Sequence, residues 1–341
     1  MTPSPTRRGS RLVAALACAV GVAGLLTAVA PAASAAPSTK QFKGVNWADP
    51  RDNYAADEVV PSGLSTADGY ATTYAKASAV IGEFAARLGA NTVRLPINPA
   101  TVNGPFWASY TGAIDAATAK GFKVILAYWE SPVPAKDGRV DDVEAFDRMW
   151  DRVTARYARH GSVYFEPMNE PFGYSSQEWR DLAADWLATH PRVRRDRVFI
   201  GGVKYSEDVK PVCADPRLDG TYLALHQYGF WHQDWTDPRQ WAADLRDRIG
   251  DCASRTVLDE VGASMTTGLD YDGPVDGSNE VAYLQAATDT LRELGMGSVY
   301  WPGLRTGDTY SLTTLHGAGT DLSLQVTNAS GLSRLRWGWG R

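Results

Sequence analysis

Short apolar segments alternate with longer amphipathic segments along most of the chain. Eight short runs, rich in β-branched and other apolar residues, predict strands: Phe42–Trp47, Thr92–Ile97, Lys123–Trp129, Val163–Glu166, Arg197–Gly201, Tyr222–His226, Thr256–Glu260 and Ser298–Trp301. The segments between and after them predict helices: Thr72–Leu88, Tyr110–Lys120, Val143–Arg159, Ser175–Thr189, Ser206–Val212, Pro238–Ile249, Glu280–Leu294 and Leu332–Trp337. Strands that alternate with helices are typical of a parallel sheet covered by helices.

Local signals at the segment ends support these helices. Ser175 can cap the helix that follows it, with Glu178 in its first turn. Gly121 and Gly295 directly follow two predicted helices, where glycine readily takes the left-handed conformation that ends a helix.

Eight repeats of strand and helix predict a single-domain α/β fold, the (β/α)8 TIM barrel, over residues 36–341. A doubly wound sheet is the alternative, and it usually carries a glycine-rich nucleotide loop after its first strand. Here Ala48-Asp49-Pro50-Arg51 follows the first strand, and no such loop is present. The barrel is therefore the favoured fold.

The first 35 residues have the pattern of a secretory signal peptide. Arg7, Arg8 and Arg11 precede an apolar run over Leu12–Ala30, and the small residues Ala33-Ser34-Ala35 follow. We predict cleavage after Ala35, with a membrane anchor as the alternative. The mature chain is then secreted and has no stable membrane association.

Charge and cysteine content change with removal of the leader. The whole chain has 34 Lys and Arg against 39 Asp and Glu, a charge of -5; without the three leader arginines the balance is 31 to 39, or -8. An acidic chain argues against a nucleic-acid partner. Cys213 and Cys252 remain as an even pair, which predicts a disulfide in an exported protein, with two buried free thiols as the alternative. We expect a monomer.

Two carboxylates stand at strand ends on opposite sides of the predicted barrel. Glu170 follows the fourth strand and Glu260 ends the seventh. Active sites of such barrels lie at the carboxyl ends of the strands. Glycoside hydrolysis requires a pair of this kind, one to protonate the leaving oxygen and one to attack the anomeric carbon or activate water.

The sequence lacks the motifs that other classes of catalytic site require. The chain has five His, none in an H-E-x-x-H or strand-end H-x-H pattern, so no catalytic metal is expected. There is no G-x-S-x-G elbow of a serine hydrolase and no phosphate-binding loop. No cofactor is expected.

The motifs at these strand ends resemble glycoside hydrolase family 5, the cellulase-like group of retaining barrel enzymes. The resemblance covers nearly the whole mature chain and rests on Met168-Asn169-Glu170-Pro171, Glu260, Arg94 within Thr92–Pro96, His226, Tyr228 and Trp301. It implies that Glu170 is the acid and then the base, and that Glu260 is the nucleophile. It also implies that Asn169 binds the sugar 2-hydroxyl.

The resemblance gives supporting roles to three further residues. Arg94 would keep Glu260 ionised, Tyr228 would donate a hydrogen bond to it, and His226 would orient the acid or the sugar. Without the motif match, an internal ion pair or a core histidine would be the simpler interpretation of Arg94 and His226.

One position departs from the family pattern. The family usually has a His after the third strand, whereas this chain has Trp129-Glu130 there, and either residue could take that role. Glu166 and Asp259, each close in sequence to a catalytic candidate, are interpreted as buried partners.

Tryptophan is more frequent than a core of this size needs, with 12 residues. Six of them fall at predicted strand ends or loops and are candidates to stack on sugar rings: Trp47, Trp107, Trp129, Trp231, Trp235 and Trp301.

The expected function is a secreted retaining glycoside hydrolase of polysaccharides or oligosaccharides, by default an endo-β-1,4-glucanase. A β-mannanase or an exo-acting glycosidase, including a furanoside-specific one, is the alternative because of the third-strand departure. A non-catalytic carbohydrate-binding barrel is a remote alternative, since both glutamates are present.

Overall fold

Eight parallel strands stand side by side in the order β4-β3-β2-β1-β8-β7-β6-β5. The computed structural model describes residues 38–51 and 54–341. The strands are β1 (Lys43–Trp47), β2 (Thr92–Ile97), β3 (Lys123–Tyr128), β4 (Val163–Glu166), β5 (Phe199–Gly201), β6 (Tyr222–Tyr228), β7 (Thr256–Gly262) and β8 (Gly297–Leu304). A parallel bridge between Phe165 and Val198 joins the two ends of this order. The predicted (β/α)8 barrel is confirmed.

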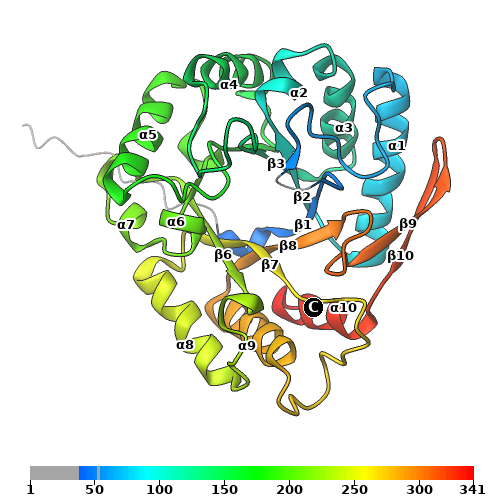
Figure 1. Cartoon of the computed structure of the whole chain (residues 1–341), viewed down its shortest axis with the longest axis vertical. Coiled ribbons are helices and arrows are strands. Elements are labelled where there is room, and N and C mark those ends of the chain that lie inside the picture. The colour runs from blue at the N-terminus through cyan, green and yellow to red at the C-terminus, as the bar shows by residue number, and fades with distance from the viewer. Residues whose placement is uncertain (1–37, 52–53) are drawn as a thin grey trace, which may run out of the picture. The chain divides into compact units, whose positions relative to one another are not determined.

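Helices surround the strands in Figure 1. They are α1 (Tyr70–Glu83), α2 (Pro99–Asn103), α3 (Trp107–Ala119), α4 (Val143–Tyr157), α5 (Ser176–Thr189), α6 (Val203–Ser206), α7 (Lys210–Cys213), α8 (Pro238–Ile249), α9 (Asn279–Leu294) and α10 (Ala329–Gly338). Shorter 3-10 turns are η1 (Thr39–Gln41), η4 (Arg195–Arg197), η5 (Pro216–Leu218), η6 (Gly229–His232) and η7 (Gly250–Cys252), and α1 continues as the π-helical turn η3 (Phe84–Leu88).

Large side chains fill the barrel at the end where its strands begin. Phe42, just before β1, makes edge-to-face contacts at 5.0–5.2 Å with the rings of Tyr164, Phe199 and Tyr222. All four rings belong to one buried cluster. Because this end is packed, the carboxyl ends of the strands are left to form a ligand site.

The structure adds a hairpin that the sequence did not predict. β9 (Thr313–Ala318) and β10 (Asp321–Val326) form an antiparallel hairpin after β8, beside α1 in Figure 1. Leu324 of β10 is buried, whereas most neighbouring side chains are exposed. The short, mostly polar strands therefore depend on their packing against α1.

The predicted disulfide is present. Cys213 of α7 and Cys252 of η7 are bonded, with their Cα atoms 6.4 Å apart. The predicted signal peptide, residues 1–35, lies outside the described residues. Among the residues that the structure does describe, no helix combines the length and apolar character that a membrane crossing requires.

Candidate active site

Glu170 and Glu260 meet at the carboxyl ends of the strands. Glu170 follows β4 with a positive φ of 48°, and Glu260 lies within β7. One oxygen of each carboxylate and one ring nitrogen of His226 all lie within 4.8 Å of one another. The structure thus brings together the two glutamates that the sequence selected.

An extra residue in β7 turns two consecutive acidic side chains toward the barrel interior. Leu258 pairs with Leu225 of β6, but the next pair joins Glu260 to His226, so Asp259 has no partner of its own. The pairing with β8 shifts at the same place. A bulge of this kind re-aims side chains that regular alternation would send to opposite faces. Asp259 and Glu260 are both buried as a result.

Arg94 of β2 is the buried cation of the site. Its Nε and Nη2 donate to both oxygens of Glu166 at 2.7 Å, and its Nη1 donates to Glu260 Oε1 at 2.7 Å. The remaining two N–H groups reach Asn46 Oδ1 at 3.0 Å and Asn169 Oδ1 at 2.7 Å. All five guanidinium donors therefore have acceptors, which holds the two carboxylates and two amides in fixed positions.

Tyr228 of β6 provides the second donor to Glu260. Its hydroxyl lies 2.5 Å from Glu260 Oε2. Burial, followed by the nearby Glu260 carboxylate, raises the pKa of Tyr228 well above its usual value, so the hydroxyl keeps its proton. With Arg94 on the other oxygen, both carboxyl oxygens of Glu260 accept a hydrogen bond.

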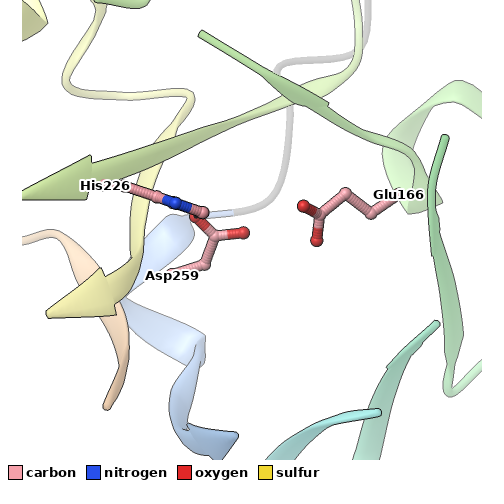
Figure 2. Close-up of side chains that lie close together, drawn as sticks. All are labelled: Glu166, His226 and Asp259. Atoms are coloured by element: carbon pink, nitrogen blue, oxygen red, sulfur yellow. The ribbon is translucent and has the colours of Figure 1, made fainter. Parts of the chain in front are cut away.

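His226 of β6 lies between the two glutamates and a deeper carboxyl group. Its Nδ1 is 3.0 Å from Glu170 Oε1 and 3.5 Å from Glu260 Oε2, and its Nε2 is 3.5 Å from Asp259 Oδ1. Burial alone lowers the pKa of His226, but the surrounding carboxylates outweigh it and raise the pKa to about 9. Figure 2 shows the ring beside Asp259, with Glu166 reaching toward them from β4.

The same residues include two groups with the spacing of a metal site. One is Glu166, His226 and Asp259, and the other is Glu170, His226 and Glu260. In both groups a carboxylate is already bound by the guanidinium of Arg94. Arg94 therefore offsets part of the negative charge of each group from within the protein.

Three of the predicted sugar-stacking tryptophans gather near the site. Trp129, after β3, stacks on Trp301 of β8 with ring centroids 5.2 Å apart and an interplanar angle of 20°. Both belong to a cluster with Tyr228, against which Trp231 packs. The indole nitrogen of Trp129 has no hydrogen-bond partner within the described residues.

The other three predicted tryptophans pack against neighbouring side chains. Asn46 of β1 points into the barrel, so strand alternation sends Trp47 outward, where its Nε1 donates to Ser62 O and its ring meets Phe84. Trp107 begins α3 and is almost fully buried. Trp235 stacks at 3.8 Å on His232. Burial of Trp47 and Trp107 contradicts the prediction that they bind substrate, whereas for the half-buried Trp235 it stays a prediction.

The sequence analysis did not identify two aromatic residues near Glu170. Phe172, two residues after Glu170, stacks on Tyr205 with ring centroids 4.4 Å apart, and Tyr205 is 46% exposed. Lys204 and Ser206, on either side of Tyr205, have φ values of 59° and 56°. Non-glycine residues at positive φ cluster at ligand sites. No sequence pattern signals this conformation.

Residues 53–303 match the model of the cellulase family, glycosyl hydrolase family 5. No curated protein sequence gives a match. The catalytic domain of the major endoglucanase from Xanthomonas campestris pv. campestris is 18% identical with a TM-score of 0.63, over 88% of this chain and 95% of that one. An endocellulase from Pyrococcus horikoshii, in complex with cellotetraose, is 15% identical with a TM-score of 0.62, over 87% and 92%.

These solved structures share the barrel, and their identities are too low to carry more than the fold. The family model covers most of the chain, from before α1 to β8. The protein therefore belongs to glycosyl hydrolase family 5 and is a glycoside hydrolase.

Proposed function

We propose that this glycoside hydrolase cleaves β-1,4-linked glucan chains internally and with retention of configuration. Glu260 is the nucleophile and Glu170 is the general acid and then the general base. The observation that carries the proposal is the pair itself: Glu170 and Glu260 approach within 4.8 Å, and Glu260 alone is held by both Arg94 and Tyr228.

In the first step Glu260 attacks the anomeric carbon while Glu170 gives its proton to the departing glycosidic oxygen. The bond to the leaving sugar breaks, and a glycosyl ester forms on Glu260. The fixed donors on Glu260 keep it ionised and free of a competing proton. Glu170, on the opposite side, has only His226 as a side-chain hydrogen-bond partner among the described residues.

In the second step Glu170, now a carboxylate, takes a proton from water, and the water oxygen attacks the anomeric carbon. Glu260 leaves as a carboxylate, so the product keeps its original configuration. Asn169 Oδ1 accepts from Arg94, which leaves the amide N–H groups to donate to a sugar hydroxyl. A contact of that kind strengthens in the transition state.

The spacing of the carboxylates supports retention. Retaining enzymes hold the two carboxyl groups about 5–5.5 Å apart, and inverting enzymes hold them about 6.5–9.5 Å apart to admit a water. One oxygen of each carboxylate lies within 4.8 Å of the other, which fits the shorter spacing better.

The aromatic residues support a sugar chain as substrate. Trp129 after β3, Trp301 of β8 and Trp231 of η6 offer apolar rings beside Tyr228. Phe172 and Tyr205 lie beside Glu170, which donates to the leaving group, and so would bind the leaving part of the chain. The signal peptide pattern supports secretion, where polymeric substrates occur.

A second candidate is an exo-acting glycosidase, including a furanoside-specific one. The stack of Trp129 on Trp301 favours it, because one indole covers a face of the other that would carry the sugar at the cleavage point. A panel of polymers and aryl glycosides, analysed by product length, distinguishes the two. Mixed short oligomers at early times support internal cleavage, and a single small product supports end-wise cleavage.

Glu170→Gln and Glu260→Gln test the catalytic pair. We expect each variant to lose at least roughly 1,000-fold in kcat on an aryl glycoside, because each removes a group that the bond changes require. Glu293→Gln is the control, since Glu293 also accepts from an arginine but does so on the surface of α9. Full activity in either site variant would refute the assignment.

Azide separates the two roles. Added azide should restore turnover of an activated glycoside by Glu260→Gly and give a glycosyl azide of inverted configuration, because azide replaces the missing nucleophile. In Glu170→Gly the product should instead keep its configuration. If Glu170→Gly gave the inverted product and Glu260→Gly the retained one, Glu170 would be the nucleophile and Glu260 the acid and base.

A further inference from the structure

Behind the catalytic pair lies a buried acidic side chain that has no hydrogen bond. Asp259 is 0% exposed, and neither of its carboxyl oxygens has a hydrogen-bond partner in the described part of the chain. His226 Nε2 also has none, and it lies 3.5 Å from Asp259 Oδ1. Buried polar groups are almost always satisfied, so two unsatisfied groups facing each other call for an explanation.

Charged groups from three other strands face Asp259. Glu166 of β4 and His226 of β6 have ligand atoms within 4.8 Å of it and of each other, and Arg94 Nε of β2 is 3.8 Å from Oδ2. Glu260 is its neighbour on β7. From β1, Asn46 donates to the backbone carbonyl of Asp259 at 3.0 Å and leaves the carboxyl group untouched.

The charges in this region balance only if the protein holds extra protons. Glu166 and Glu260 take both ends of the Arg94 guanidinium, so Asp259 has no cation of its own. An unpaired carboxylate in such surroundings is strongly disfavoured. Burial, and then repulsion by Glu166, raise the pKa of Asp259 well above its usual value.

We infer that Asp259 and His226 share one proton between Oδ1 and Nε2, and that Asp259 is thereby a positioning residue that keeps the Nδ1–H of His226 directed at Glu170. Only the role of Glu170 in this inference rests on the proposed function. The proton lies either on nitrogen, facing a carboxylate, or on oxygen, facing a neutral imidazole. Both arrangements have the same total charge and the same number of protons, and in both Nδ1 is a donor.

This arrangement matters because Nδ1 faces two carboxylates, Glu170 at 3.0 Å and Glu260 at 3.5 Å. A ring with a lone pair at Nδ1 would repel both. With Nδ1–H in place, His226 stabilises Glu170 as the carboxylate that must act as base in the second step. Buried aspartates behind a catalytic histidine fix its tautomer in the same way in serine proteases.

Nitrogen NMR of the imidazoles tests the shared proton without any substrate. The chain has only five His, and His226→Gln assigns the signal of interest. In the wild type we expect Nδ1 to stay protonated from pH 5 to pH 8, with no titration near the usual value of about 6.5. A wild-type His226 that titrates between pH 5 and pH 7 would overturn the inference.

Two substitutions of Asp259 distinguish positioning from packing. Asp259→Ala should lower the pH at which His226 titrates by at least one unit. It should also reduce kcat roughly 10- to 100-fold with little change in KM, and narrow the pH range over which kcat stays high. Asp259→Asn offers an amide N–H to Nε2 and should recover kcat to within about 5-fold of the wild type. Asp215→Asn, another buried aspartate but remote from the barrel axis, is the control.

An unchanged His226 titration in Asp259→Ala, or no recovery in Asp259→Asn, overturns the inference. Thermal unfolding of each variant shows whether it is folded, and the wild-type titration decides the matter if Asp259→Ala does not fold. If the Glu170 and Glu260 variants stay active, the proposed function fails while the imidazole signals still report on the shared proton. If those variants are inactive and the signals do not depend on Asp259, the inference alone fails.

Discussion

At the scale of single residues, Arg94 organises the site, because every N–H group of its guanidinium donates to another side chain. Arg94 uses all five N–H groups on side chains from four other places in the barrel. Removing one partner of a buried ion pair usually costs about 3–5 kcal/mol, because the other charge is left uncompensated. Glu166 therefore has a clear function. It supplies a counter-charge at Nε and Nη2 of Arg94, while Nη1 of the same guanidinium holds Glu260.

Tyr228→Phe tests the second donor to Glu260. The variant keeps the ring but loses the hydroxyl that lies 2.5 Å from Oε2. A hydrogen bond to a charged group contributes about 1.5–3 kcal/mol, so we expect kcat to fall roughly 10- to 100-fold.

The control for this variant is Tyr70→Phe. Tyr70 also donates its hydroxyl to a carboxylate, Asp115, but does so on α1, outside the barrel. Its kinetics should match the wild type. A kcat of Tyr228→Phe equal to that of the wild type would contradict the role of this hydroxyl.

At the scale of elements, the bulge in β7 has the largest effect on function. Regular alternation would place Asp259 and Glu260 on opposite faces of the strand. The extra residue brings both to the interior, one beside Glu170 and one to the back of His226. Asn46 and Trp47 of β1 do alternate: the first enters the barrel and the second packs against the helices.

The capping box at the start of α5 can be tested directly by substitution. The Ser175 side chain accepts from the backbone of Glu178, and the Glu178 side chain accepts from the backbone of Ser175. Ser175→Ala removes one of these bonds and should lower the free energy of unfolding by about 1 kcal/mol. Ser176→Ala, one residue on, is the control and should change it by less than about 0.5 kcal/mol. Denaturant titration at pH 7 measures both, and equal losses would argue against the capping box.

At the scale of the whole molecule, the disulfide is the strongest single constraint outside the core. Cys213 and Cys252 close a loop with a sequence separation of 39 residues between α7 and η7. In the chain-entropy model such a link raises the free energy of unfolding by about 4 kcal/mol. The double variant Cys213→Ser, Cys252→Ser should lose about that much in denaturant titration.

The same variant should keep its kcat at a temperature where it is folded, because the disulfide lies at the opposite end of the barrel from the strand ends that form the site. Reduction of the wild type with dithiothreitol should reproduce the loss of stability. A large fall in kcat without a change in stability would show that the link has a role at the site itself.

The sequence by itself determined the barrel, and its resemblance to the family selected the two glutamates that the structure brings together and their main partners. Local patterns sufficed, because buried strands, helix caps and a few strand-end motifs are short-range signals. The ends of α8 were predicted to the residue, since Asp237 and Pro238 mark its start and Gly250 its end.

Only the tertiary structure decided which side chains work together. Whether a tryptophan binds sugar or fills the core depends on the face of its strand and on its neighbours, so Trp47 and Trp301 could not be told apart by position in the chain. The bulge that aims Asp259 at His226 and the positive φ values around Tyr205 arise from contacts between distant segments. These contacts are long-range, and a single sequence carries no local trace of them.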